Sequence, residues 1–252
     1  MTDIWSLIIL DPMLNGLLAL SSLLPKAVEF GLAIVILTLV VRGAMTPLML
    51  RQLRSTKAMQ EMQPKLQELQ KKYSKNKQKL QQEMMKVYKE AGVNPIGCMW
   101  PLLVQFPIWI ALYQSIMKAL ATTPENLLDL SRHLYDYDRI ARAIPVNSEF
   151  LWLDLGQPDG TLILAILVGG SMYIQQKMTT PPSADPRQQS TSRTMLLMMP
   201  LMFGLFTTMF PSGLPLFWLV SNLIGIGTQY FLTGGWGYLK SPAPAETRAK
   251  KK

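Results

Sequence analysis

The chain has 252 residues, of which 49% are hydrophobic, and it carries a formal net charge of +9. A soluble domain this basic would indicate a nucleic-acid-binding protein, but here the apolar residues stand in long blocks. About 20 apolar residues span the hydrocarbon core of a bilayer. A single cysteine, Cys98, excludes a disulfide framework and a cysteine-rich metal site. We therefore expect an all-α polytopic membrane protein without metal or other cofactor.

The N-terminal region, residues 1–26, is apolar but too short to cross a bilayer before Pro25. We expect an interfacial helix on the outer surface, with Asp11 as the N-cap and Pro12 at the first helical position. A buried lid on the helix bundle is the alternative. The N-terminus carries Asp3 and lacks the basic segment of a signal peptide, which is typical of a mature bacterial membrane protein.

Five segments are predicted to cross the membrane. The last apolar block is divided by the turn Phe210–Pro215, which is rich in proline and glycine. The predicted spans are residues 27–50, 94–120, 161–178, 195–211 and 214–233. Between and after them we expect a cytoplasmic helical hairpin, an extracytoplasmic loop, a cytoplasmic loop and a basic cytoplasmic tail, at residues 51–93, 121–160, 179–194 and 234–252.

The hairpin is predicted from apolar residues at 3-4-3-4 spacing on both sides of a polar break at residues 74–77. This pattern is typical of two antiparallel helices that pack along narrow seams. Pro64 is expected to kink or break the first helix. The charged outer faces are either a solvated surface or a basic arm that meets ribosomal RNA or anionic lipid.

The distribution of charge orients the spans, because short loops rich in lysine and arginine stay in the cytoplasm. Residues 51–92 contain 11 Lys and Arg against 4 acids, whereas residues 121–160 contain 7 acids against 3 Arg. The tail ends in three lysines. We expect the N-terminus outside, the C-terminus inside, and a location in the bacterial inner (plasma) membrane.

Arg42 is the most informative residue, because it lies inside the first apolar block. A guanidinium in the hydrocarbon core costs roughly 3 to more than 10 kcal/mol and usually faces a wet cavity or a partner. Arg42 lies nine residues before Arg51, and therefore about 13 Å inside the cytoplasmic boundary. Thr38 is on the same helical face. No acidic residue lies deep in any predicted span, so we interpret Arg42 as a functional residue.

Neutral polar residues in the other spans could line a hydrated cavity with Arg42. The alternative is ordinary hydrogen bonding between helices, at about 0.6–2 kcal/mol each. These residues are Gln105, Gln114, Ser115, Ser171, Gln175, Gln176, Thr207, Thr208, Ser221, Asn222, Thr228 and Gln229.

Four motifs closely resemble the YidC/Oxa/Albino family of membrane protein insertases, in particular its short bacterial members. They occur in the family order and lie within residues 28–231. The motifs are Thr38–Leu48 (TLVVRGAMTPL), Met62–Leu66 (MQPKL), Asn94–Pro107 (NPIGCMWPLLVQFP) and Phe210–Asn222 (FPSGLPLFWLVSN).

The resemblance implies five helices around a hydrophilic groove that opens to the cytoplasm and the lipid. In the family pattern, Arg42 corresponds to the groove arginine and Thr38 and Gln105 to its polar companions. Residues that contact a sliding substrate helix correspond to Phe106, Trp109, Phe217 and Trp218. The implied partners are nascent membrane proteins, the Sec translocon and the ribosome, which the hairpin and tail would contact.

We therefore expect an insertase or chaperone, not an enzyme, that takes no small-molecule substrate. Its expected substrate-binding residues are those named for the family together with Gln175, Ser221 and Asn222. A small-solute or ion transporter or channel is the main alternative, although no acidic residue at depth supports ion coupling. An intramembrane protease is disfavoured because no Asp or His lies in a span to form a catalytic dyad.

Overall fold

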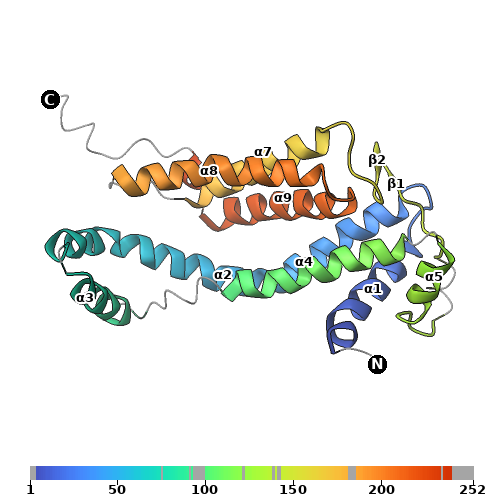
Figure 1. Cartoon of the computed structure of the whole chain (residues 1–252), viewed down its shortest axis with the longest axis horizontal. Coiled ribbons are helices and arrows are strands. Elements are labelled where there is room, and N and C mark those ends of the chain that lie inside the picture. Colours follow the sequence, from blue (N-terminus) through green and yellow to red (C-terminus); the bar gives the residue numbers. More distant parts are fainter. Residues whose placement is uncertain are drawn as a thin grey trace. The chain divides into compact units, whose positions relative to one another are not determined.

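The structure is a computed structural model that describes residues 4–74, 76–90, 92, 100–120, 123–137, 140, 143–180, 186–233 and 235–239. The chain is mostly helical (Figure 1). It forms two compact units, one of residues 1–42 with 108–252 and one of residues 43–107. Several predicted features lie partly outside the described residues: the N-terminal region at 1–3, the hairpin at 75, 91 and 93, the start of the second span at 94–99, the extracytoplasmic loop at 121–122, 138–139 and 141–142, the cytoplasmic loop at 181–185, and the tail at 234 and from Lys240.

The N-terminal region begins with a π-helical turn, η1 (Ser6–Leu10), which runs directly into α1 (Asp11–Ser21). Asp11 has helical dihedrals (φ −64°, ψ −43°). The prediction that Asp11 is the N-cap is therefore wrong, because an N-cap residue leaves the helical conformation and here helical backbone precedes Asp11. Its carboxylate instead contacts His133.

A single helix, α2 (Glu29–Lys72), covers the first predicted span and the first arm of the predicted hairpin. Its 44 residues continue through Pro64, so the alternative that Pro64 breaks the helix is wrong. A proline removes one backbone hydrogen bond, which a long helix can tolerate. Among the described residues, Glu29–Leu50 is the one helical stretch long and apolar enough to cross a membrane, with a mean hydropathy of 2.0.

The unit of residues 43–107 contains the predicted hairpin. After the turn that follows α2, the chain enters α3 (Lys77–Glu90), which forms the second arm (Figure 1). Met62 and Leu66 of the predicted apolar seam are buried. At the turn, the Lys79 ammonium lies 5.5 Å from the centre of the Tyr73 ring, a cation–π contact.

The larger unit contains the C-terminal helices α7 (Ile163–Thr179), α8 (Pro186–Thr207) and α9 (Gly213–Thr233), and most of α4 (Trp100–Ala119). Helix α7 packs against both α8 and α9 (Figure 1). Helix α8 begins at Pro186, inside the range predicted as a loop. Proline is favoured at the first helical position, and the polar residues after it extend the helix beyond its apolar block.

Glycines allow α7 and α8 to approach closely. A Cβ atom at Gly169 of α7 would lie 3.1 Å from the Pro200 carbonyl oxygen, and one at Gly204 of α8 would lie 3.2 Å from the Ala165 carbonyl oxygen. Small residues four apart on both helices are the usual device for close helix contact in membranes. The two helices therefore form a tightly packed pair.

The described residues between α4 and α7 include a short helix and a two-stranded hairpin. Thr123 caps α5 (Pro124–Ser131) through its side chain, which accepts a hydrogen bond from the Asn126 amide. Strands β1 (Glu149–Phe150) and β2 (Leu153–Asp154) pair in antiparallel register, a feature absent from our prediction.

Backbone hydrogen bonds tie this loop to the turn between α8 and α9. The Ser212 amide donates to the Gln157 carbonyl at 2.8 Å, and the Gly213 amide donates to the Leu155 carbonyl at 3.1 Å. The turn therefore lies at the same end of the larger unit as the loop. At the opposite end of α7, the 3-10 turn η3 (Gly237–Leu239) packs against this helix. An added Cβ at Gly237 would lie only 2.5 Å from the Met178 carbonyl oxygen.

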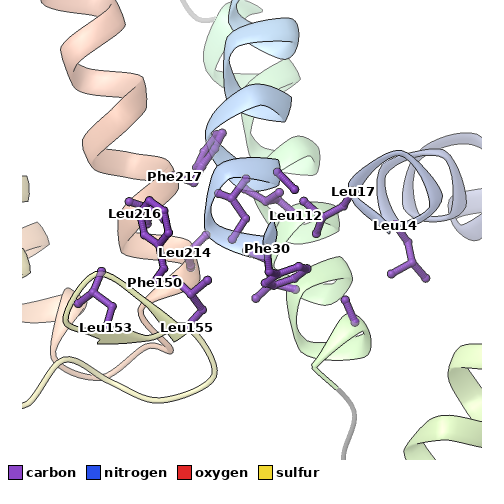
Figure 2. Close-up of a cluster of buried hydrophobic side chains, with 14 of the residues drawn as sticks. Leu14, Leu17, Phe30, Leu112, Phe150, Leu153, Leu155, Leu214, Leu216 and Phe217 are labelled. Atoms are coloured by element: carbon purple, nitrogen blue, oxygen red, sulfur yellow. The ribbon is translucent and has the colours of Figure 1, made fainter. Parts of the chain in front are cut away.

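The core of the larger unit is a cluster of apolar side chains from α1, α2, α4, the β-hairpin and α9 (Figure 2). Phe150 packs on Gly31, where an added Cβ would overlap its ring. The labelled members of the cluster, all at least nine-tenths buried, are Leu14, Leu17, Phe30, Leu112, Phe150, Leu153, Leu155, Leu214, Leu216 and Phe217.

Candidate functional site

Arg42 and Thr38 lie one helical turn apart on α2, as their spacing predicts. Thr38 is buried, and its hydroxyl donates to the Ile34 carbonyl at 2.6 Å. Because this bond uses the hydroxyl hydrogen within the helix, the Thr38 oxygen can only accept a hydrogen bond from another group. Arg42 is half-buried. The residue as a whole is thus neither fully enclosed nor fully exposed, although its Nε atom is enclosed.

Gln105 and Phe106 belong to the unit of residues 43–107. Gln105 is half-buried, and its Nε2 is enclosed with no hydrogen-bond partner among the described residues. Phe106 is 58% exposed. An exposed phenylalanine at a helix surface is suited to contact with lipid or an apolar helix, whereas an enclosed amide donor favours a polar partner.

Trp109 and Trp218 are brought together by α4 and α9. Their ring centroids are 6.0 Å apart and their planes are inclined by 64°, an edge-to-face contact. Neither indole nitrogen has a hydrogen-bond partner among the described residues, although both are enclosed. Two indole donors therefore lie in an otherwise apolar region, where a carbonyl oxygen of another helix would be a favourable acceptor.

Sequence reasoning missed the aromatic residues that complete this cluster. Phe203 of α8 contacts Trp109 at 6.2 Å and Trp218 at 5.4 Å between centroids. Phe210 contacts Trp218 at 6.2 Å and Tyr113 at 6.0 Å. Phe203 lies within α8, but Phe210 follows the end of that helix at Thr207, so helical spacing in the sequence does not bring these rings together.

Asn222 and Gln175, expected to bind substrate, pack between α7 and α9. Asn222 Nδ2 donates to Ser171 Oγ at 3.2 Å, and Ser171 Oγ donates to the Val168 carbonyl at 3.0 Å. The Gln175 amide rests on Gly225, where a Cβ would overlap it. The Asn222–Ser171 bond is hydrogen bonding between helices, the alternative that the sequence left open, whereas Gln175 makes a packing contact with Gly225.

Phe217 and Ser221 complete the predicted set on α9. Phe217 is fully buried in the apolar cluster of Figure 2, among leucines of neighbouring elements. Ser221 is buried as well, and its hydroxyl has no hydrogen-bond partner among the described residues. Phe217 therefore supports the fold in this structure, while Ser221 offers a polar group one turn from Trp218.

The chemistry of the site is that of binding. Within the described part of the chain, no three His, Cys, Asp or Glu side chains are grouped so as to hold a metal ion. The candidate residues supply a cation, neutral hydrogen-bonding groups and aromatic surface. Such a set can hold and release a polypeptide segment that has both polar and apolar parts.

Helices with large exposed apolar side chains around a small buried core are typical of an α-helical membrane protein, whose outer surface faces lipid. Ile166 of α7, Leu201 of α8 and Phe231 of α9 are all more than 60% exposed. The sequence matches the family described as 60Kd inner membrane protein across residues 22–236. The chain belongs to this family, which confirms the resemblance to the YidC/Oxa/Albino proteins.

Individual relatives agree with the family match. The chain is 39% identical over 228 residues to membrane protein insertase MisCA of Bacillus subtilis (strain 168), covering 89% of this chain and 77% of that protein. It is 41% identical to membrane protein insertase YidC of Oceanobacillus iheyensis, over 77% of this chain and 70% of the relative. A YidC of Histophilus somni (strain 2336) is 39% identical over 92% of this chain, which spans only 38% of that protein.

Proposed function

We propose that this chain is a membrane protein insertase and chaperone that transfers segments of nascent membrane proteins into the bacterial inner membrane. The observation that carries the proposal is the similarity over 89% of the chain to a protein named membrane protein insertase. The family is named for a membrane protein, not for a class of enzyme. The structure adds a cation on an apolar helix and an aromatic cluster between helices.

The proposed topology has five spans, formed by the first part of α2 and by α4, α7, α8 and α9, with the N-terminus outside. The hydrogen bonds from Ser212 and Gly213 support this arrangement, because they hold the α8–α9 turn beside the loop at residues 121–160. Both segments would then face outside. The basic segment 51–92 and the C-terminal tail would face the cytoplasm, in agreement with the positive-inside rule.

Arg42 is proposed to attract the polar or acidic part of a nascent segment into a hydrated, cytoplasm-facing groove. An ionised arginine in a medium of low dielectric constant attracts a carboxylate far more strongly than it would in water. It also lowers the free energy of a polar segment that must leave water. Thr38, one helical turn away on the same face of α2, is its proposed polar companion.

Release into lipid is proposed to be driven by the substrate itself. A stretch of about 20 apolar residues gains free energy on entering the hydrocarbon core, so the protein needs only to lower the barrier. The aromatic rings of Phe106 and Trp109 provide adaptable apolar surface for a sliding helix. The proposal does not require a bound cofactor or a source of chemical energy.

The hairpin is the proposed contact for the ribosome and for anionic lipids. Lysines along the end of α2 and on α3 are exposed, and exposed cations are attracted to phosphate groups. A hydrogen bond from Lys86 to Glu83, together with the charge of Glu83, raises the pKa of Lys86, which keeps it cationic. Cooperation with the Sec translocon is proposed because the family resemblance implies the translocon as a partner. Among the described residues of this segment, the exposed lysines are Lys65, Lys71, Lys72, Lys77, Lys79, Lys86 and Lys89.

The function can be tested in proteoliposomes that contain the purified protein and receive a ribosome-bound single-span substrate with an acidic N-terminal tail. Insertion is measured as protection of the tail from external protease. We expect insertion with the wild-type protein, a loss of roughly tenfold with Arg42→Ala, and substantial activity with Arg42→Lys. A substrate with a neutral tail should depend less on Arg42.

The controls separate the proposal from its rivals. Empty liposomes give the spontaneous background. Uptake of labelled ions or small solutes by the same proteoliposomes tests the transporter alternative, and we expect none above background. Insertion no better than in empty liposomes would overturn the proposed function. Full insertion by Arg42→Ala with the acidic tail would overturn only the electrostatic role of Arg42.

A further inference from the structure

The chain's single histidine connects α1 to the segment after α5. His133 Nδ1 lies 2.7 Å from Asp11 Oδ1 of α1, and the two side chains are only 19% and 10% exposed. An ionised carboxylate can only accept hydrogen bonds. The Nδ1 atom must therefore carry the proton and donate it to Asp11, which fixes the tautomer of the neutral ring.

The other ring nitrogen faces a second carboxylate. His133 Nε2 lies 3.9 Å from Asp129 Oδ1, and Asp129 is itself paired with Lys118 of α4. When the ring is neutral, Nε2 presents a lone pair to this carboxylate. When the ring is protonated, Nε2 becomes a donor, and a chain of alternating charges runs from Asp11 through His133 and Asp129 to Lys118.

The backbone beside His133 is held to α1 independently of this charge. Asn15 Nδ2 donates to the His133 carbonyl at 2.8 Å, and the Tyr135 amide donates to Asn15 Oδ1 at 2.8 Å. The amide of Asn15 therefore positions the loop, and the imidazole stays opposite both carboxylates. A change in the charge of the ring alters the attraction between α1 and α5 without first requiring the loop to move.

The surrounding charges determine the direction of the effect. The hydrogen bond from Lys118 is the main cause that lowers the pKa of Asp129, and the charges of Lys118, His133 and Arg132 add to it against desolvation. The Asp129 carboxylate is thus held as an anion at neutral pH. The described charged groups that face the ring or its carboxylate partners are Asp11 on α1, Lys118 on α4, Asp129 on α5 and Arg132 directly after it.

We propose that His133 is a proton-operated latch that fastens the N-terminal helix α1 to α5. A proton on Nε2 turns a lone-pair contact with Asp129 into an attraction and strengthens the bond to Asp11. The latch tightens in acid and loosens as the pH rises. In the proposed topology it lies on the extracytoplasmic face, where it would respond to external pH. The latch itself does not depend on insertase activity.

The protonation state of the His133 ring can be observed directly, because the chain has one histidine. In protein labelled with ¹⁵N-histidine and held in lipid nanodiscs, ring ¹⁵N spectra distinguish a proton on Nδ1 from one on Nε2. At pH 8 we expect the Nδ1–H tautomer, and at pH 5.5 protons on both nitrogens. A ring that is mainly the Nε2–H tautomer at pH 8 would overturn the proposal.

The mechanical consequence is measured by hydrogen–deuterium exchange of α1, corrected for the intrinsic effect of pH. In the wild-type protein, exchange in α1 should slow severalfold between pH 8 and pH 5.5. His133→Asn keeps a donor near the Nδ1 position but cannot be charged, so this pH dependence should disappear. Asp129→Asn should weaken it, and Asp136→Asn, an exposed acid in the same loop, should leave it as in the wild type. Equal pH dependence in the wild type and His133→Asn would refute the latch.

Discussion

The indole rings of Trp109 and Trp218 meet edge to face, with centroids 6.0 Å apart, and each ring also contacts Phe203. Three helices, α4, α8 and α9, are therefore connected through one aromatic cluster. Edge-to-face pairs contribute about 0.5–1.5 kcal/mol beyond the burial of their surface. Trp218, which contacts three rings, is the centre of the cluster.

A double-mutant cycle should reveal this connection. We expect Trp109→Leu and Trp218→Leu each to destabilise the protein, and the double variant to lose less than the sum by about 0.5–1.5 kcal/mol. The measurement is equilibrium unfolding in mixed detergent micelles. Phe231→Leu, on an 83% exposed residue, is the control and should change the free energy of unfolding by less than about 0.5 kcal/mol. Strict additivity would show that the two indoles act independently.

Adjacent glycines of α7 should respond to alanine in opposite ways. At Gly169 the new methyl group would lie 3.1 Å from the Pro200 carbonyl oxygen, whereas at Gly170 nothing lies within 4 Å. We expect Gly169→Ala to destabilise by about 1–3 kcal/mol through overpacking. Gly170→Ala should stabilise by up to about 1 kcal/mol, because alanine loses less backbone entropy in a helix. Equal effects of the two substitutions on thermal unfolding would contradict the close contact of α7 and α8.

The hydrogen bond between Asn222 and Ser171 should stabilise the α7–α9 pair. Asn222→Ala and Ser171→Ala should each cost about 0.6–2 kcal/mol, and their effects should not add, because either change removes the same bond. The proteoliposome assay decides whether Asn222 also binds substrate. If it only packs, Asn222→Ala and Ser171→Ala should lower insertion equally at equal folded fraction. A selective loss in Asn222→Ala would favour substrate contact.

Asp159 should make stability depend on pH in the acidic range. Burial raises the pKa of its carboxyl, but donors from the Thr161 hydroxyl, the Leu164 and Thr161 amides and the Trp152 side chain outweigh this, so the pKa lies below the ordinary 3.8. A lowered pKa means that the folded state favours the anion. The contribution is complete above the unfolded pKa and is lost as the pH falls through the folded one.

The matching variant is Asp159→Asn, which keeps the shape of the side chain without the charge. At pH 7 we expect it to lower the free energy of unfolding by about 1.5–3 kcal/mol, the range for hydrogen bonds to a charged group. The difference from wild type should shrink as the pH falls below about 4. Asp154→Asn, on an exposed carboxylate in the same loop, is the control. A difference that stayed constant down to pH 2 would exclude the charge as the cause.

Local patterns in the sequence predicted a mostly helical chain, as the structure has it, but not its long-range contacts. The spacing of Thr38 and Arg42 places both on one face of α2. The cap of α5 by Thr123 is also a local feature, although it was not among the predictions. By contrast, the contact of Asp11 with His133 joins residues 122 positions apart, so a rule about N-caps could not reveal it.

The roles of polar residues within the spans were the hardest to predict. Asn222 and Gln175 were expected to bind substrate because they are polar and deep. In the structure they meet Ser171 and Gly225 of neighbouring helices. Sequence alone gives the depth of such a residue but not the direction of its side chain around the helix bundle. The aromatic cluster was missed for a related reason, because its members come from three separate helices.

The apolar cluster around Phe30, Leu112, Phe150 and Phe217 bears on whether protons can leak across the membrane through the protein. Its side chains are almost entirely inaccessible to solvent, and tightly packed apolar constrictions resist the entry of water and ions. In the proposed topology, the cluster fills the outer part of the bundle, opposite the cytoplasmic entrance. It would act as an electrical insulator, so that polar segments could enter from one side without discharging the proton gradient.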